Sequence, residues 1–102
     1  MNRYPRIVAT LLTFTLTSFL AAQMTVSGTV TDASSGDPLP GANIVVTGTS
    51  NGTAANNNGA FSIENVNNNA TLSVSMIGYE SETKSASSTV NFQLTKEALQ
   101  LS

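Results

Sequence analysis

The chain has 102 residues, which is enough for one domain. It contains neither histidine nor cysteine, which removes the commonest general base and metal ligand and excludes disulfides and thiol chemistry. Beyond residue 22 only two lysines stand against six acidic residues, a net charge of −4 that repels phosphate backbones, so no nucleic acid is expected as a partner.

Residues 1–22 have the order of a secretory signal peptide. Two arginines form a basic start, an apolar run follows over residues 7–20, and two alanines precede Gln23. Hydroxyl side chains interrupt the run, which is shorter than the ~20 apolar residues that a spanning helix needs. The pattern predicts export with cleavage after Ala22, and an uncleaved membrane anchor or a buried helix are the alternatives.

From residue 23 onward, short runs in which apolar and polar residues alternate are separated by turn residues. A period of two places alternate side chains on opposite faces of a strand. The runs predict strands at 24–31, 42–47, 53–55, 60–63, 71–76, 79–84 and 90–94, with 53–55 and 79–84 at sheet edges. The predicted core consists of Val26, Val30, Ile44, Val46, Phe61, Ile63, Leu72, Val74, Val90, Phe92 and Leu94.

No sustained period of 3.6 follows the apolar start, so a parallel βαβ topology is not expected, and residues 96–101 have only weak helical or tail character. Short strands at near-regular spacing favour two antiparallel sheets packed face to face. We expect this sandwich over residues 23–95, and residues 96–102 as a tail or the start of a linker.

Two loops contain residues that could take part in chemistry. Asp32 and Asp37 flank one loop, but a carboxylate pair acts in glycoside hydrolysis only at a fixed separation in a cleft, for which a small sandwich has little room. Asn56-Asn57-Asn58-Gly59 could offer oxygens to calcium, yet it lacks the carboxylates that tight sites include. We expect ordinary turns at both places, with no catalytic, cofactor or metal residue.

Three further residues invite a functional interpretation. Asn51 and Asn69 begin Asn-x-Thr sequons, which are modified only in a host with glycosylation machinery, and plain turn asparagines are the favoured interpretation. Tyr79 could present its ring to a sugar or a partner. Packing against the end of the sandwich, with the hydroxyl in water, is favoured instead.

Many of these residues together, in this order, resemble the carboxypeptidase regulatory-like domain, a small transthyretin-like β-sandwich. The resemblance covers about residues 25–94 and rests on Gly28, Val30, Asp32, Gly36, Pro38, Leu39, Pro40, Gly41, Ala42, Val45, the run 48–53, Gly59, Phe61, Ile63 and the run 72–79. It implies an all-β, seven-stranded antiparallel Greek-key sandwich. It also implies an accessory domain without enzyme activity.

Behind a signal peptide, this combination is most similar to the N-terminal extension of SusC/RagA-type TonB-linked outer membrane receptors. The resemblance implies a non-catalytic domain on the periplasmic side of the outer membrane, in a receptor that imports glycans, peptides or similar nutrients. Its partners would be the plug and barrel of the same longer chain or complex, with TonB-side proteins of the periplasm as further candidates.

Residues 23–102 are too few for a membrane barrel, so we expect this chain to be a fragment of a longer receptor or the product of a truncated gene. Two alternatives stay open. One is a free-standing secreted β-sandwich that binds or adheres to a surface, and the other is the regulatory domain of a peptidase.

Overall fold

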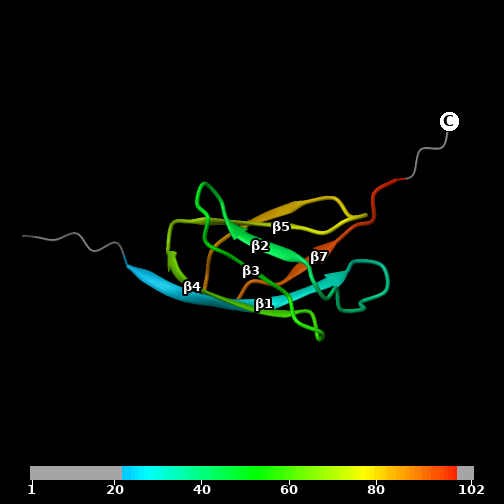
Figure 1. Ribbon diagram of the computed structural model, residues 1–102, viewed down its shortest axis with the longest axis horizontal. Coiled ribbons are helices and arrows are strands. Elements are labelled where there is room, and N and C mark those ends of the chain that lie inside the picture. Colours follow the sequence, from blue (N-terminus) through cyan, green and yellow to red (C-terminus); the bar gives the residue numbers. More distant parts are fainter. Residues whose placement is uncertain (1–21, 99–102) are drawn as a thin grey trace, which may run out of the picture.

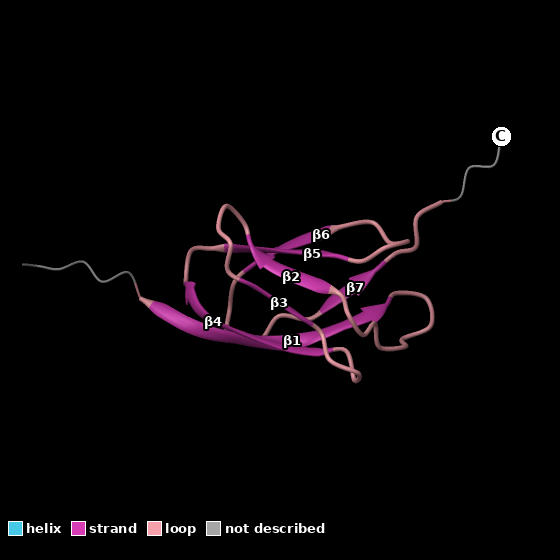
Figure 2. Ribbon diagram, viewed as in Figure 1, coloured by secondary structure: helices cyan, strands magenta, loops and turns pink. Residues whose placement is uncertain are grey.

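The computed structural model describes residues 22–98, so all of the expected signal peptide except Ala22, and residues 99–102 of the expected tail, lie outside the described residues. Within that range no helix is long and apolar enough to cross a bilayer. The strands, drawn in Figures 1 and 2, are β1 (Gln23–Asp32), β2 (Asn43–Val46), β3 (Gly52–Ala54), β4 (Ala60–Asn67), β5 (Thr71–Ser75), β6 (Glu82–Ser85) and β7 (Phe92–Leu94).

The strands form two sheets, in the orders β4-β1-β7 and β3-β2-β5-β6, which confirms the predicted sandwich. Both strands expected at edges, β3 and β6, are edge strands. One pairing differs from the expected antiparallel pattern, because β1 and β7 run parallel. They are the first and last strands, so no tight hairpin fixes their relative direction. The chain therefore enters the sandwich at one end and leaves at the other (Figure 1).

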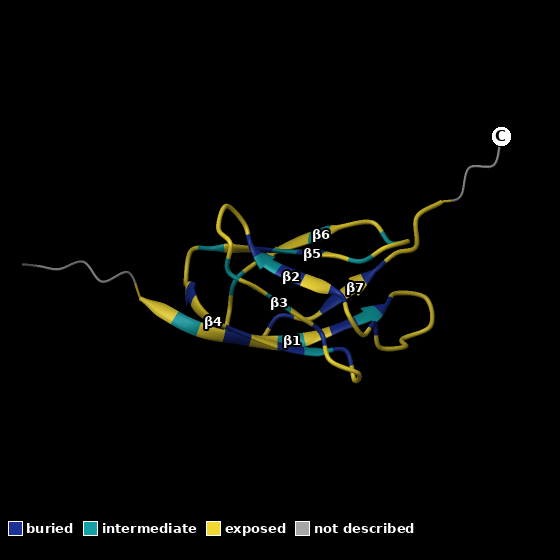
Figure 3. Ribbon diagram, in the orientation of Figure 1, coloured by how far each residue is buried: buried dark blue, intermediate teal, exposed yellow. Residues whose placement is uncertain are grey.

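The apolar residues of the two inner faces form one core, and along residues 23–30 of β1 exposed positions alternate with buried or partly buried ones (Figure 3). Every residue of the predicted core is buried. The core also takes in four residues that the alternating pattern did not identify, namely Leu39, Ala42, Ala55 and Val66. Because this core closes within residues 22–98, the segment contains what an independently folding unit needs.

Val66 is buried because β4 is longer than the expected strand at 60–63. The register between β1 and β4 shifts between Met24 and Val26, which marks a bulge. Asn65 takes up the extra residue with a φ of 60°, a left-handed conformation that asparagine tolerates. The bulge therefore turns Ile63 and Val66, three positions apart, toward the same core.

Gly28 lies where β1 meets the segment that leads into β7. A Cβ atom there would be 1.7 Å from the carbonyl oxygen of Val90. The approach is fixed on both sides, because the Val90 N–H donates to the Ser27 carbonyl at 2.9 Å and Asn91 Oδ1 accepts from the Thr29 N–H at 3.0 Å. Only a residue without a side chain fits at this point.

We expect Gly28→Ala to destabilise the domain by at least about 1–3 kcal/mol, the usual cost of overpacking, because the added methyl group meets rigid backbone. Thermal unfolding of residues 23–102, followed by circular dichroism, should show a melting temperature lower by roughly 10 °C. Ser27→Ala, at the exposed neighbouring position, is the control. A melting temperature equal to that of the control would contradict the close approach of β1 and Val90.

Candidate docking surfaces

Asp32 is the charged side chain that the described residues bury, with 5% of its surface exposed. Its Oδ1 accepts hydrogen bonds from the backbone N–H groups of Ser34 at 2.8 Å and Ser35 at 3.1 Å. Its Oδ2 accepts from the Tyr79 hydroxyl at 2.7 Å, and Lys96 Nζ lies 3.9 Å away. Because both oxygens already have donors, this carboxylate holds loops together.

Asp37, the second candidate carboxylate, is exposed. Its backbone carbonyl accepts from the Asp32 N–H at 2.9 Å, and its own N–H donates to Ser35 Oγ at 3.1 Å. The loop therefore uses the backbone of Asp37, while the Asp32 carboxylate points at other donors. Among residues 22–98 no hydrogen-bond donor is shared by the carboxylates of Asp32 and Asp37.

Tyr79 joins this buried carboxylate to the C-terminal end of the described chain. Tyr79 pairs with Lys96 in an antiparallel bridge. The Glu80 N–H donates to the Thr95 carbonyl at 2.8 Å, and the Glu97 N–H donates to the Gly78 carbonyl at 2.9 Å. Residues 95–97, which include the start of the expected tail, are thus fastened to the loop between β5 and β6.

The ring of Tyr79 packs against the core, as predicted. The expectation that its hydroxyl lies in water was wrong, because the hydroxyl donates to Asp32, 47 residues earlier in the chain. We call Asp32, Tyr79 and Lys96 the Asp32 cluster. It connects the end of β1, the β5–β6 loop and the segment after β7.

The Asp32 cluster makes stability depend on pH in the acid range. The hydrogen bond from the Tyr79 hydroxyl, followed by those from Ser35 and Ser34, lowers the pKa of Asp32. The same bond raises the pKa of Tyr79. A carboxyl with a lowered folded-state pKa contributes stability above its unfolded value of about 3.9, and loses it as the pH falls through the folded-state pKa.

We expect Tyr79→Phe to lower the melting temperature at pH 7, where Asp32 is ionised and accepts the hydroxyl bond. The deficit should shrink toward about pH 2, where protonation of Asp32 removes the charged acceptor in both proteins. Ser87→Ala removes a hydroxyl that donates to the neutral Thr89 carbonyl and should give a deficit independent of pH. A deficit for Tyr79→Phe that is the same at both pH values would contradict the role of the ionised carboxylate.

The asparagine-rich turn before β4 is held by its own first side chain. Asn56 Oδ1 accepts from the backbone N–H groups of Asn58 at 2.9 Å and Ala60 at 3.0 Å, and Gly59 has a φ of 74°. The amide oxygen that could have served calcium is therefore occupied by backbone donors. Among residues 22–98 no group of three or more acidic residues is placed to hold a metal ion.

The two sequon asparagines also lie in turns. Asn51 Nδ2 donates to the Glu64 carbonyl at 2.8 Å, so this side chain ties the β2–β3 turn to β4 in the opposite sheet. Asn69 is exposed in the turn between β4 and β5. The Asn51 amide thus has a structural task, which a turn dipeptide in the sequence does not reveal.

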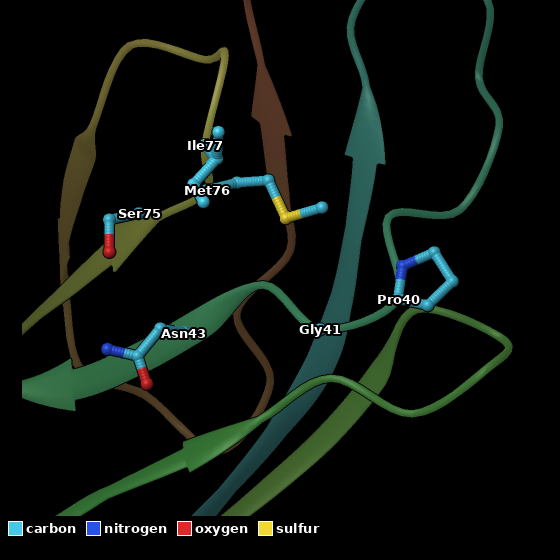
Figure 4. A pocket seen from close by; sticks show the side chains of 6 residues that line it. All are labelled: Pro40, Gly41, Asn43, Ser75, Met76 and Ile77. Carbon is cyan, nitrogen blue, oxygen red and sulfur yellow. The ribbon is translucent and has the colours of Figure 1, made fainter.

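A groove of about 460 Å³ opens where β2 begins and β5 ends. It is lined by Pro40, Gly41, Asn43, Ser75, Met76 and Ile77, and the Met76 side chain extends across it in the direction of Pro40 (Figure 4). Ile77 is 97% exposed. The polar side chains here are an amide and a hydroxyl, which do not titrate near neutral pH. The groove suits apolar contact and not acid–base chemistry.

The edge strand β6 carries charges that deter pairing. Glu82 and Lys84 pair with buried residues of β5, so both side chains point to the inner face of the sheet. Lys84 Nζ reaches across to the neighbouring sheet, where it donates to the Asn91 carbonyl at 2.7 Å and lies 5.7 Å from the centre of the Phe92 ring. Inward charges on an edge strand are a common defence against added strands.

The outer edges of β7 and β4 are bonded at their ends by other parts of the protein. Just before β7, Lys84 Nζ donates a hydrogen bond to the Asn91 carbonyl, and just after it the Glu80 N–H donates to the Thr95 carbonyl. On β4, the N–H of Ala60 donates to Asn56 Oδ1 and the Glu64 carbonyl accepts from Asn51. Side chains and loops thus cover the ends of these two edges.

The fold and these surfaces define a small β-sandwich module whose polar side chains mainly serve its own loops and edges. The family model of the CarboxypepD_reg-like domain matches residues 26–102. The chain belongs to this family, which confirms the resemblance seen in its loops and strands.

One similar protein is TonB-dependent receptor P3 of Formosa agariphila, which is 42% identical over 59 residues. The match takes in 58% of this chain and 6% of the receptor, so the chain spans a small part of that protein's length. A cohesin–X-dockerin complex from Acetivibrio cellulolyticus contains a similar fold, with a TM-score of 0.52 and 21% identity over 71% of this chain and 52% of that one. This second likeness concerns the fold alone.

Proposed function

We propose that this chain is the non-catalytic N-terminal periplasmic domain of a longer SusC/RagA-type TonB-dependent outer membrane receptor that imports nutrients such as glycans or peptides. The observation that supports it best is the 42% identity to a TonB-dependent receptor, within a stretch that makes up 6% of that receptor. A domain of this size would then precede the plug and barrel, in the same chain or complex, that perform transport.

The site geometry supports a role in contact and not in catalysis. The buried carboxylate of Asp32 has its oxygens occupied by Ser34, Ser35 and Tyr79, and the oxygen of Asn56 is occupied by backbone N–H groups. Neither group is free to transfer a proton or ligate a metal. We therefore propose that the domain is not an enzyme and binds neither cofactor nor metal.

The direction of the chain agrees with this placement. Residues 1–22 would direct export and be removed, and the sandwich would begin at Gln23 at one end of the molecule. The segment after β7 leaves at the opposite end of the molecule (Figure 1), and Lys96 of this segment lies 3.9 Å from Asp32. Residues 96–102 would thus start a linker toward the plug. That linker's first residues are held by the β5–β6 loop.

A free-standing secreted binding module is the second candidate, and the exposed Ile77 beside an apolar groove favours it. The two candidates differ in what the complete gene encodes. A receptor needs a closed barrel, because lipid offers no hydrogen-bond partners and every backbone group must be paired within the protein. Its strands would be about ten residues long, with alternating apolar and polar residues. A secreted module needs none of this.

The experiment is to read the gene beyond the codon for Ser102 and to locate the protein in cell fractions by mass spectrometry. We expect a plug and alternating strands to follow, and a mature N-terminus at Gln23 in the outer membrane fraction. Deleting residues 23–95 in the receptor should reduce nutrient uptake while the barrel stays in the membrane. A free chain in the medium, with no barrel encoded with it, would contradict the receptor and favour the secreted module.

A further inference from the structure

We infer that the outer edge of β3 is a docking site for an extended segment of a second protein, one with an aliphatic side chain at its centre and basic residues beside it. The segment would add to the four-stranded sheet next to β3. This inference deepens the proposed function, on which it rests for the setting in which the partner is met. The unpaired edge of β3 is seen in the fold itself and does not depend on the proposed function.

Two residues of β3 turn their backbone N–H and C=O groups away from β2, toward the open edge of the sheet. Ile44 pairs with Thr53, and the flanking bonds from the Val46 N–H to the Asn51 carbonyl and from the Ala55 N–H to the Ala42 carbonyl fix the ladder. In an antiparallel ladder the residues whose backbone groups face the partner strand alternate with those that face away.

Thr53 therefore faces β2, while Gly52 and Ala54 turn their N–H and C=O groups outward. For these groups no backbone or side-chain partner is found among residues 22–98. An added strand could bond to both residues at successive positions, as strand addition requires.

The edge of β3 also lacks the defences that the structure shows elsewhere. β6 has the inward charges of Glu82 and Lys84, and the ends of the β4 edge are taken by Asn56 and Asn51. In contrast, β3 consists of Gly52, Thr53 and Ala54, which are small and uncharged. Its short length is its one protection, so a complex at this edge should be weak and exchange quickly.

A groove beside β3 can receive a side chain from the added strand. It has a volume of about 300 Å³ and is lined by Ala54, Asn56, Ala60, Phe61 and Ser62, between the edges of the two sheets. Thr53 pairs with the buried Ile44, so both point to the inner face. The residue of the segment opposite Thr53 would therefore point inward as well, toward this groove. An aliphatic side chain fits that position.

Charge determines what should flank the aliphatic residue. Strand β4 lines the groove with Ala60, Phe61 and Ser62, and its one charged side chain is Glu64, which is exposed. Both lysines that the structure describes are engaged elsewhere, Lys84 at the Asn91 carbonyl and Lys96 beside Asp32. This side of the sandwich therefore presents negative charge without a neighbouring cation, and a segment with lysine or arginine complements it.

The test uses 15N-labelled residues 23–102 and an acetylated, amidated peptide of sequence Lys-Thr-Thr-Val-Thr-Thr-Lys, with NMR shifts as the readout. We expect saturable shifts at the amides of Gly52, Thr53 and Ala54. Ala54→Pro removes an outward N–H that the fold does not use, because proline is tolerated on the free side of an edge strand. It should weaken binding by about tenfold, as loss of a hydrogen bond and its geometry predicts.

Thr83→Pro is the matched control, because the ladder between β5 and β6 turns the Thr83 N–H outward on the guarded edge. It should leave the affinity unchanged, and thermal melts establish that both variants are folded. A peptide with glutamates in place of lysines should bind more weakly than the lysine peptide.

Unchanged affinity in folded Ala54→Pro, or shifts confined to β6 and β7, would overturn the inference. Shifts of Gly52 and Ala54 that grow with protein concentration alone would assign the edge to a second copy of the chain and overturn it too. Absence of peptide binding in a domain that a receptor gene does encode would refute this edge and leave the proposed function intact. Peptide binding at β3 in a domain whose gene encodes no barrel would support this edge and refute the proposed function.

Discussion

The buried carboxylate of Asp32 is the interaction on which one end of this sandwich depends. A charge can be buried only when donors replace the water that it loses. Here the donors come from three parts of the chain: the loop after β1, Tyr79 before β6, and Lys96 after β7. If the carboxylate were lost, the loop, the tyrosine and the departing chain would lose their common partner. A residue of the first strand thus contacts both the β5–β6 loop and the segment by which the chain leaves the domain.

The second constraint is the number of edges that two small sheets expose. Each open edge invites another strand, and natural proteins protect most of them. In this domain the protection is polar: Lys84 crosses from β6 to the Asn91 carbonyl, and Asn51 crosses from the β2–β3 turn to β4. These side chains join the two sheets as well as covering backbone. Among the described residues, the short strand β3 has no such cover at Gly52 and Ala54, and for this reason we propose it as the docking edge.

Much of this fold could be predicted from the sequence because most of its strands alternate apolar and polar residues, as in Leu72, Val74 and their polar neighbours. The bulge at Asn65 could not be predicted from that period, although the spacing of three between Ile63 and Val66 was a signal. The parallel pairing of β7 was missed because alternation contains no information on strand direction.

The Asp32 cluster was missed for a different reason. Asp32 follows a strand and precedes two serines, so local rules explain it fully as a turn residue. Its bonds to Ser34 and Ser35 obey those rules, but the bond from Tyr79 spans 47 residues, and no local pattern reports it. The contacts that cover the sheet edges could not be predicted for the same reason, because Lys84 and Asn51 bond to residues on other strands.

The most direct test of this account is amide hydrogen exchange of residues 23–102 in the native state, resolved residue by residue. We expect fast exchange at Gly52 and Ala54, whose N–H groups face outward, and protection at Thr53 between them. We also expect protection at Ala60 and Glu80, where a side chain and a loop close the other edges. Protected amides at Gly52 and Ala54 in the monomer, or unprotected ones at Ala60 and Glu80, would contradict the account.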